Sequence, residues 1–440
     1  MSSSEADVVI KADIVVTMKS PEEVHSPGFV AIKDDRIVEV GSTGRLHIRA
    51  KETMNLRGHV LMPGLVNTHT HSPMTLMRGV IEDVPLDRWL NEICWPLERH
   101  LTAEHVYDGS LLAQVEMLKN GVTTFNDHYF HMDEVVRALS SSGCRAALCH
   151  AIIEAGDTRR GRRELAESVR FARRYSHHPS GRIKTFLGPH AEYSCSEELL
   201  RAAGNEAKAH GLAVHMHFAE DRDRYEQIKK RKGMEPALML DRMGLLAKGS
   251  VFAHGVHMSE REARLLAKRG VSLSHNPVSN MKVVAGLAPI SRFKRAGLVV
   301  GLGTDGPASN NTLDLLRDLR VAAILRKAVD GDAFAGRAFD VLKEATADGA
   351  KAIGWGPLLG TLEAGKKADV VAIDTGAPHF RPLVDVYASL VYSATGADVS
   401  HVFVDGRLVV NKRRLTTLNE TEVMTKAERS AKKLLKLAGF

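Results

Sequence analysis

The middle of the sequence alternates eight times between a short apolar run and a longer stretch with helical spacing. Residues 106–121 show that spacing, because leucine, valine and methionine recur at helical intervals before Gly121. Strands that alternate with helices form parallel sheets, and apolar strands suit a sheet that helices cover. Eight such units predict an α/β fold, a TIM-type (β/α)8 barrel. The apolar runs are residues 59–71, 121–130, 144–153, 182–193, 211–220, 249–258, 270–280 and 297–306.

The two ends of the chain resemble each other and differ from the middle. Residues 8–56 show short strands joined by turns, and Asp34-Asp35 interrupts one run as a hairpin turn would. The same texture returns in 366–376 and 400–410, and the tail 421–440 has the pattern of an amphipathic helix. We therefore expect a small β-sandwich domain built from both ends. The predicted division is 1–59 for its N-terminal part, 60–360 for the barrel, and 361–440 for its C-terminal part with the terminal helix.

Composition excludes several functions. A chain of 440 residues with 44% hydrophobic residues is long enough for one large barrel beside a smaller domain. The formal charge of +7 is a mild excess, and only 5% of residues are aromatic. The basic clusters at 159–163 and 229–232 contain no interleaved aromatic residues, so we interpret them as solvated faces and expect no nucleic-acid partner.

The four cysteines and the apolar segments indicate the compartment. No CxxC pair occurs, so a thiolate zinc site has no support, and reduced thiols fit a cytoplasmic protein. The N-terminus lacks the pattern of a signal peptide, and no run approaches 18 uncharged apolar residues, so we expect no membrane partner. A homo-oligomer remains open. The cysteines are Cys94, Cys144, Cys149 and Cys195.

Histidines and acids gather near the carboxyl ends of the predicted strands. In a barrel these ends form the face that carries the active site. Any one such residue is more simply a hydrogen-bonded core or loop side chain, but their shared placement favours a functional site. The residues are His69, His71, Asp127, His128, His190, His217, Glu220, His254, His275 and Asp305.

His69 and His71 are two residues apart on the first strand. Side chains alternate along a strand, so both imidazoles point to the same side. His217 can add a third nitrogen from across the barrel, and Asp305 can add an oxygen from the last strand. Three imidazoles and one carboxylate suit Zn²⁺ or Fe²⁺.

A metal of this kind lowers the pKa of a bound water from about 15.7 to about 7. Asp305 can then accept the proton of that water, and His254 can assist by hydrogen bonding. Glu220 can protonate a ring nitrogen while hydroxide attacks the adjacent carbon. The competing interpretation of Glu220 is a surface salt bridge with a nearby arginine, Arg222 or Arg224.

Several motifs resemble the amidohydrolase superfamily, in its branch of amino-group and halide hydrolases. They are PGLVNTHTHSPMTLMRG from residue 63, HMHFAE at 215–220, SHNPVSNMK at 274–282, LGTDGPASNN at 302–311 and GTLEAGKKADVVAIDT at 360–375. The similarity runs from about residue 8 to 412. It implies one divalent metal per subunit, preferably zinc with iron as the alternative, held by His69, His71, His217 and Asp305.

Within that branch the chain most resembles the 5′-methylthioadenosine/S-adenosylhomocysteine deaminases, through DHYF at 127–130, WPLE at 95–98 and GPHAEYSCS at 188–196. The resemblance implies a small-molecule purine nucleoside substrate. It implies that Glu98 binds the ribose hydroxyls, and that His190, Glu220 and Asp305 also contact substrate. An arginine of the 159–163 cluster, with Arg163 favoured, is a further candidate. The 5′ substituent of the nucleoside stays open.

Four other interpretations compete. A guanine, pterin or triazine hydrolase of the same branch would share the metal site and differ at Glu98 and His190. Separately, the competing interpretation of Glu98 itself is a salt bridge with Arg88 or Arg99. A two-metal hydrolase needs a lysine at the end of the fourth strand, whereas Lys184 falls near its start. A cytidine-type deaminase needs a PCxxC motif, which is absent. A metal-free scaffold protein should lack ligands, and here none is missing.

Overall fold

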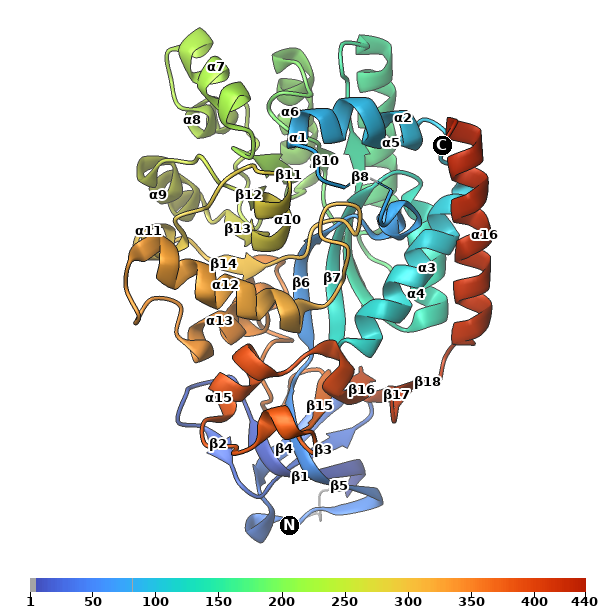
Figure 1. The fold of residues 1–440 in the computed structure, drawn as a ribbon, viewed down its shortest axis with the longest axis vertical. Coiled ribbons are helices and arrows are strands. Elements are labelled where there is room, and N and C mark those ends of the chain that lie inside the picture. Colours follow the sequence, from blue (N-terminus) through green and yellow to red (C-terminus); the bar gives the residue numbers. More distant parts are fainter. Residues whose placement is uncertain (1–4, 81) are drawn as a thin grey trace.

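The computed structural model describes residues 5–80 and 82–440. A mixed β-sheet with the N-terminal strands occupies one end of the molecule, and the alternating strands and helices occupy the rest (Figure 1). None of the helices in the described ranges is long and apolar enough to span a lipid bilayer. All four cysteines are buried free thiols.

All eight predicted barrel strands are present, the fourth in two pieces. They form a five-stranded parallel sheet in the order β10-β8-β7-β6, with β9 beside β8, and a four-stranded parallel sheet in the order β11-β12-β13-β14. The strands are β6 (Leu65–Thr70), β7 (Val122–Tyr129), β8 (Arg145–Ile152), β9 (Ile183–Thr185), β10 (Gly188–Pro189), β11 (His215–Phe218), β12 (Val251–His254), β13 (Ser272–His275) and β14 (Val300–Leu302).

The two parallel sheets meet along two seams. At one, the backbone N–H of Asp305, after β14, donates to the carbonyl of His69 in β6 over 3.0 Å. Gly303 permits this approach, because a Cβ there would lie 3.0 Å from the His69 nitrogen. At the other, the N–H of His217 donates to the carbonyl of His190 over 2.8 Å. The arrangement is consistent with a TIM-type barrel, although the strand pairing of the described residues records two sheets and no closure.

Helices follow the strands in chain order and cover them. Many begin at a capping side chain, as α5 does where Asp157 accepts from the N–H groups of Arg159 and Arg160. The helices are α3 (Ala103–Lys119), α4 (Met132–Ser142), α5 (Thr158–Tyr175), α6 (Glu197–His210), α7 (Arg222–Lys232), α8 (Pro236–Arg242), α9 (Glu260–Arg269), α10 (Pro277–Lys282), α11 (Ile290–Arg295), α12 (Leu315–Asp330), α13 (Ala338–Glu344) and α14 (Ala347–Ala352).

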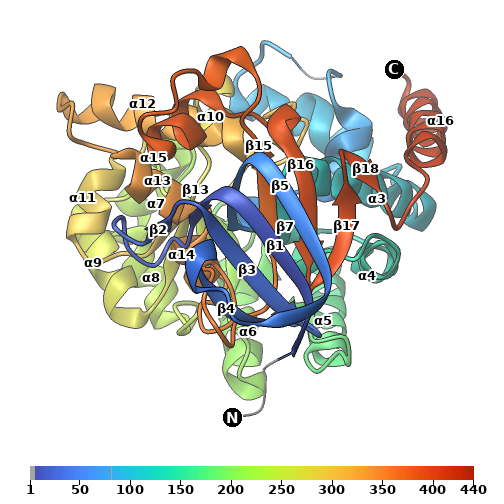
Figure 2. The same cartoon turned by 90° about the horizontal axis from the view of Figure 1, so that it is seen from below.

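Both chain ends contribute to one nine-stranded sheet, seen from below in Figure 2, in the order β18-β17-β16-β15-β5-β1-β3-β4 with β2 beside β1. The antiparallel pair β5–β15 joins the two ends, as the sequence predicts, and Asp34 turns the β3–β4 hairpin with φ of 52°. This pairing describes a single sheet, so the expected sandwich stays a prediction. The strands are β1 (Glu5–Val16), β2 (Val24–His25), β3 (Gly28–Lys33), β4 (Arg36–Ser42), β5 (Arg49–Pro63), β15 (Val370–Asp374), β16 (Val399–Val404), β17 (Arg407–Asn411) and β18 (Arg414–Leu415).

Two further segments lie outside this scheme. The predicted terminal helix, α16 (Glu420–Ala438), packs along α3 (Figure 1). A lid of short helices, residues 86–98, lies over the carboxyl ends of the parallel strands; it comprises α1 (Leu86–Arg88), a π-helical turn (Trp89–Cys94) and α2 (Trp95–Glu98). Short helical turns also occur at Thr43–Arg45, Ser72–Met77, Pro378–Phe380, α15 (Val386–Ala388), Ser389–Ser393 and Gly396–Asp398.

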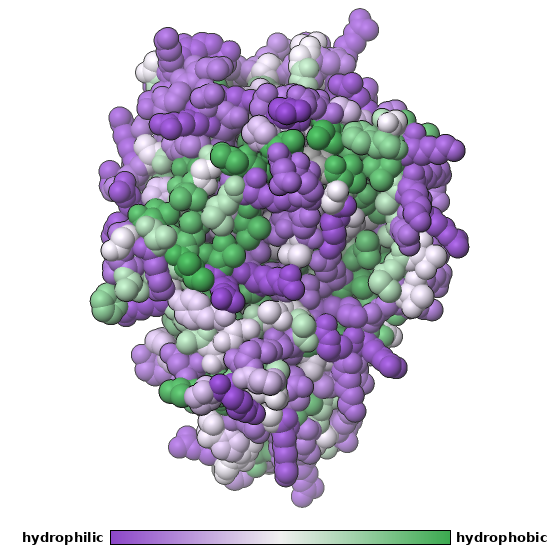
Figure 3. Space-filling view, viewed as in Figure 1, coloured by the Kyte–Doolittle hydropathy of each residue, from purple (hydrophilic) through white to green (hydrophobic). Residues whose placement is uncertain are grey.

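The basic clusters identified in the sequence lie on helices α5 and α7, where most of their side chains are exposed. Figure 3 shows the end of the molecule that carries α5 to α8 as largely hydrophilic.

Candidate metal centre and substrate pocket

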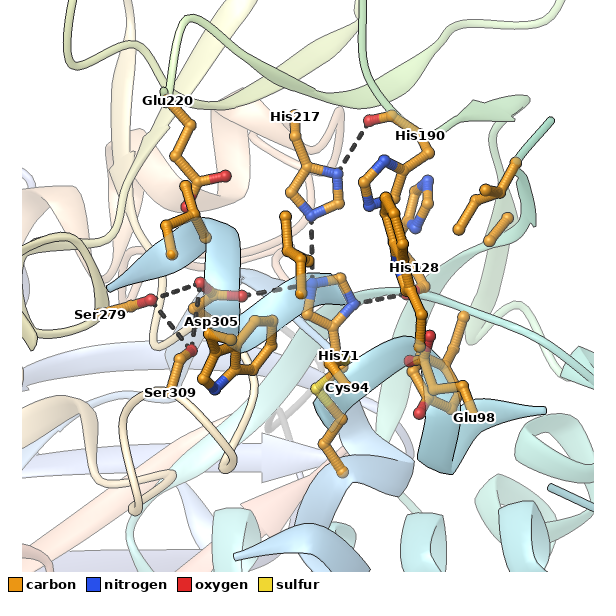
Figure 4. Close-up of a pocket in the computed structure, with 18 of the residues that line it drawn as sticks. His71, Cys94, Glu98, His128, His190, His217, Glu220, Ser279, Asp305 and Ser309 are labelled. Atoms are coloured by element: carbon orange, nitrogen blue, oxygen red, sulfur yellow. Dashed lines mark hydrogen bonds and ion pairs between the residues drawn. The ribbon is translucent and has the colours of Figure 1, made fainter. Parts of the chain in front are cut away.

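A pocket lies at the carboxyl ends of the parallel strands, beneath the lid of residues 86–98 (Figure 4). Side chains from both parallel sheets and from the lid line it. They include His71, Trp89, Cys94, Glu98, His128, Tyr129, His190, His217, Glu220, His254, Ser279, Asp305 and Ser309. The strand ends therefore converge as the sequence predicts.

His69, His71, His217 and Asp305 meet at the bottom of this pocket. The Asp305 Oδ1 atom lies 3.4 Å from Nε2 of His69 and 3.2 Å from Nε2 of His71. The Nε2 atoms of His71 and His217 are 3.1 Å apart. Nε2 of His69 is buried and has no hydrogen-bond partner among the described residues. Three imidazoles and one carboxylate converging in this way fit a divalent cation such as Zn²⁺.

The other ring nitrogens of these histidines are held by neighbours. His71 Nδ1 lies 2.6 Å from the carbonyl oxygen of His128, and His217 Nδ1 lies 2.8 Å from that of His190. His69 Nδ1 lies 2.9 Å from Nε2 of His215. Contacts of this kind orient an imidazole so that its free nitrogen faces the metal position.

The Asp305 carboxylate is fixed by several donors. The Ser279 hydroxyl donates to Oδ2 over 2.6 Å, and the N–H of Gly306 donates to Oδ1 over 2.8 Å. Ser309 lies farther from Oδ2, at 3.4 Å, and 2.9 Å from Ser279 (Figure 4). Burial raises the pKa of Asp305, but His69 and His71 outweigh it and hold that pKa well below its usual range. Asp305 is therefore a carboxylate.

The side chain of Glu220 points towards Asp305 (Figure 4), and Glu220, His254 and Asp305 form one group of candidate ligands. Glu220 is 5% exposed, and burial together with Asp305 raises its pKa well above the usual range. The preceding Ala219 has φ of 49°, and its N–H donates to Glu192 over 3.0 Å, which turns Glu220 inward. Burial therefore favours the protonated form of Glu220, which is placed to donate a proton.

The competing interpretation of Glu220, a surface salt bridge with Arg222 or Arg224, is wrong. Arg224 pairs instead with Asp87 of the lid over 2.6 Å, and the structure records no Glu220–arginine pair among the residues it describes. The nearest partner of Glu220 is His254, whose Nδ1 lies 3.6 Å from Oε1.

His254 lies between Glu220 and the histidine cluster. Its ring is 5.4 Å from that of His69, and Asn280 Nδ2 lies 2.9 Å from His254 Nδ1. Burial lowers the pKa of His254 to about 3, so the ring is neutral. Its Nε2 atom has no hydrogen-bond partner within the described ranges. That nitrogen is therefore free to bind a water or a substrate atom.

Glu98 and His190 line the side of the pocket nearest α2. Glu98 is half-buried, which raises the pKa of its carboxyl, and it forms no recorded ion pair in the described part of the chain. Arg88, its proposed alternative partner, pairs with Glu92 over 2.9 Å. His190 is buried and neutral, with a pKa of about 3, and its Nδ1 lies 2.8 Å from the Ser194 hydroxyl.

Some sequence candidates lie outside the pocket lining. Asp127 accepts hydrogen bonds from the N–H and hydroxyl of Ser72. His275 is buried but does not line the pocket. Arg163 is largely exposed and pairs with Glu164 over 3.2 Å; with Arg160 it lines an adjoining groove that reaches Glu98.

The sequence analysis missed His215, Ser279, Ser309 and Tyr129. All four lie in motifs that carry the family resemblance, but only His215 has a chemical signal of its own, because its spacing from His217 repeats the His-x-His pattern of the first strand. The other three are ordinary residue types whose roles depend on what they contact.

Comparison with known proteins supports the same chemistry. A model of the amidohydrolase family matches residues 60–409. The chain is 44% identical over 410 residues to a 5-methylthioadenosine/S-adenosylhomocysteine deaminase of Desulforudis audaxviator, spanning 93% of this chain and 95% of the relative. It is 41% identical over 430 residues to a 5′-deoxyadenosine deaminase of Methanosarcina acetivorans, spanning 98% and 99%. An adenosine deaminase of Xanthomonas campestris, solved with bound zinc, has a TM-score of 0.93 at 34% identity and covers 98% and 99%.

Proposed function

The chain belongs to the amidohydrolase family, and we propose that it hydrolyses the exocyclic amino group of an adenosine-type nucleoside, yielding the inosine analogue and ammonia. Its relatives are named for 5-methylthioadenosine, S-adenosylhomocysteine and 5′-deoxyadenosine, and a structural relative for adenosine. These four nucleosides are the proposed substrates. The names of the relatives support this substrate class over a guanine, pterin or triazine substrate.

One observation carries the proposal. Glu220 is a buried carboxyl group whose protonated form is favoured by burial, and it lies beside His254 and Asp305, where Asp305 meets His69 and His71, and His71 meets His217. Deamination of a purine ring needs this combination, because a ring nitrogen must gain a proton while water attacks the adjacent carbon. A buried carboxyl group beside an imidazole nitrogen without a hydrogen-bond partner is unfavourable in a scaffold protein that binds neither metal nor substrate there. The arrangement therefore favours an enzyme.

We assign the four-residue cluster to one divalent metal, with zinc favoured over iron because the structural relative was solved with zinc. When bound, the metal supplies a water of lowered pKa. The orphaned Nε2 of His69 and the absence of a lysine among the described residues that line the pocket support a single ion. Lys184, at the start of the fourth strand, contacts the carbonyl of Gly354 instead.

The side chains of the pocket transfer the protons and bind the substrate. Asp305 accepts the proton of the attacking water on its carboxylate, and Nε2 of His254 hydrogen-bonds the same water. Glu220 donates its proton to N1 of the purine as the oxygen bonds to C6. The proton held by Asp305 then passes to the amino group, and the C6–N bond breaks to release ammonia. The hydroxyl on C6 gives its proton back to Glu220 as it becomes the carbonyl of the inosine analogue. His190 contacts the purine, and Glu98 accepts hydrogen bonds from both ribose hydroxyls.

The proposal extends to the organisation of the protein. We assign residues 60–360 to the catalytic barrel, and residues 1–59 and 361–440 to a β-sandwich domain. We further propose a cytoplasmic enzyme whose partner is the small-molecule substrate, with a homo-oligomer as an open possibility.

The direct test is ammonia release. The zinc-loaded protein is offered adenine, guanine, cytosine, adenosine, 5′-deoxyadenosine, 5′-methylthioadenosine and S-adenosylhomocysteine. We expect turnover of the nucleosides and little of the free bases. Turnover of guanine alone identifies another hydrolase of the branch, and no turnover of any aminated ring contradicts the proposal.

Two variants separate the assigned roles. Glu220→Gln removes the proton donor and should lower kcat by about a hundredfold or more with the metal still bound. Glu98→Ala should raise KM for nucleosides and leave metal content unchanged. Loss of metal in Glu98→Ala would show that its assigned role is wrong. Glu92→Ala, at an exposed neighbouring position of the lid, serves as the control.

A further inference from the structure

Tyr129 is a pocket residue to which neither the sequence motifs nor the metal cluster gives a role. It ends strand β7, is 2% exposed and lines the pocket. Its hydroxyl makes no hydrogen bond of ordinary geometry in the described part of the protein, and its nearby polar neighbour is the Glu98 carboxylate. A buried polar group without a partner is unfavourable, and in a native structure it calls for an explanation.

The position of Tyr129 suggests what satisfies its hydroxyl. Its ring lies 6.1 Å from that of His71, and both Tyr129 and Glu98 line the same wall of the pocket. Burial and the neighbouring Glu98 carboxylate raise the pKa of Tyr129 well above its usual range. The phenol is therefore a neutral donor adjacent to a carboxylate that can only accept.

This pairing matches the chemistry of a sugar hydroxyl. A hydroxyl donates one hydrogen bond and accepts two, so a carboxylate alone satisfies only its donor. We infer that the Tyr129 phenol donates a hydrogen bond to the ribose hydroxyl that Glu98 accepts from, and that Tyr129 thereby helps select ribonucleosides. The inference rests on the proposed nucleoside substrate.

An unpartnered tyrosine is not by itself a site. Tyr387 is also buried with an unpaired hydroxyl, but it does not line the substrate pocket. Tyr129 differs because its hydroxyl shares the pocket with an acceptor already assigned to the sugar. Tyr387 is therefore a matched control for the same chemical change.

The test pairs a deletion in the enzyme with a deletion in the substrate. kcat/KM is measured for Tyr129→Phe and the unmodified zinc enzyme with adenosine, 2′-deoxyadenosine and 3′-deoxyadenosine. We expect Tyr129→Phe to lower kcat/KM for adenosine by about tenfold, mainly through KM. For the one deoxynucleoside that lacks the bonded hydroxyl, the same substitution should change kcat/KM by less than about twofold.

An equal loss on all three nucleosides, or no loss on any, overturns the inference. So does a fall in kcat with a fall in metal content, because Tyr129 would then act through His71. Tyr387→Phe should change none of these values. If the unmodified enzyme turns over no nucleoside, the proposed function and this inference fall together; if it does and the Tyr129→Phe losses are uniform, only this inference falls.

A stability measurement guards against a misfolded variant. Because the hydroxyl makes no hydrogen bond of ordinary geometry, its removal should change stability little, and the Tm of metal-free Tyr129→Phe should stay close to that of the unmodified protein. A lower Tm indicates that the hydroxyl has a structural partner, which also contradicts the inference.

Discussion

The Nδ1 atom of His69 lies 2.9 Å from the Nε2 atom of His215, so one buried imidazole orients another. If His69 binds a metal through Nε2, its proton sits on Nδ1 and His215 must accept it. His215 is buried and its pKa is held well below the usual range, first by burial and then by neighbouring histidines, so it is neutral and can accept. Its own Nδ1 lies 3.7 Å from the Cys149 sulfur.

Replacing His215 should weaken metal binding. His215→Leu leaves the His69 Nδ1–H without an acceptor, and we expect zinc affinity to fall by about tenfold to a hundredfold. His215→Gln keeps an acceptor oxygen and should lose less. The measurement is competition against a chromophoric chelator, with His275→Gln as the control, because His275 is buried outside the pocket. Equal affinities for His215→Leu and the unmodified protein would contradict this role.

Ser279 should affect the chemical step more than metal binding. Its hydroxyl donates to Oδ2 of Asp305 over 2.6 Å, which holds the carboxylate with Oδ1 towards His69 and His71. We expect Ser279→Ala to lower kcat by about tenfold while metal content stays near one ion. Ser309→Ala should cost less, because Ser309 lies 3.4 Å from the same oxygen. A larger loss in Ser309→Ala reverses the order and rejects the assignment.

Glu192 should make the folded protein less stable as the pH rises. Burial raises its pKa from 4.5 to about 7, so the folded state holds a proton that the unfolded chain loses earlier. Stability therefore falls as pH rises from 4.5 to about 7 and stays reduced above that range. Glu192→Gln removes this penalty and should raise the free energy of unfolding at pH 8 by up to about 3 kcal/mol. At pH 4.5 the two proteins should be equally stable. Urea unfolding at both pH values checks this, and a pH-independent difference rejects it.

Glu344 should make the folded protein less stable as the pH falls. It is fully buried and accepts from Arg326 over 2.7 Å and from Lys294 over 2.6 Å, joining α13 to α12 and α11. Burial raises the pKa of Glu344, but these cations outweigh it and bring that pKa to about 2. The contribution is complete above pH 4.5 and is lost as pH falls from 4.5 towards 2.

Glu344→Gln leaves Arg326 buried without a counter-charge. We expect a loss of about 3–5 kcal/mol in the free energy of unfolding at pH 7, shrinking as pH falls towards 2. Glu92→Gln, which breaks the exposed pair with Arg88, should cost less than about 1 kcal/mol. Similar losses in the two variants would show that the buried pair carries no special weight.

Much of the fold and the convergence of the metal cluster could be predicted from the sequence. The eight strands follow from apolar runs between helical stretches. The sequence predicts a metal cluster of His69, His71, His217 and Asp305 because these residues fall at strand ends. The structure confirms that these four meet. The structure also argues against the alternative salt bridges. Arg224 pairs with Asp87 and not with Glu220, and Arg88 pairs with Glu92 and not with Glu98.

The sequence by itself determined which residues face inward and at which end of each strand they lie, because side-chain direction follows the local period of the backbone. Only the tertiary structure decided which of them touch. His69 and His215 are 146 residues apart in the chain, and their contact depends on how the two parallel sheets are aligned at their seams. Likewise, Tyr129 and Tyr387 are both buried tyrosines, but only Tyr129 lines the substrate pocket, because the carboxyl end of β7 lies in the same pocket as Cys94 and Glu98 of the lid.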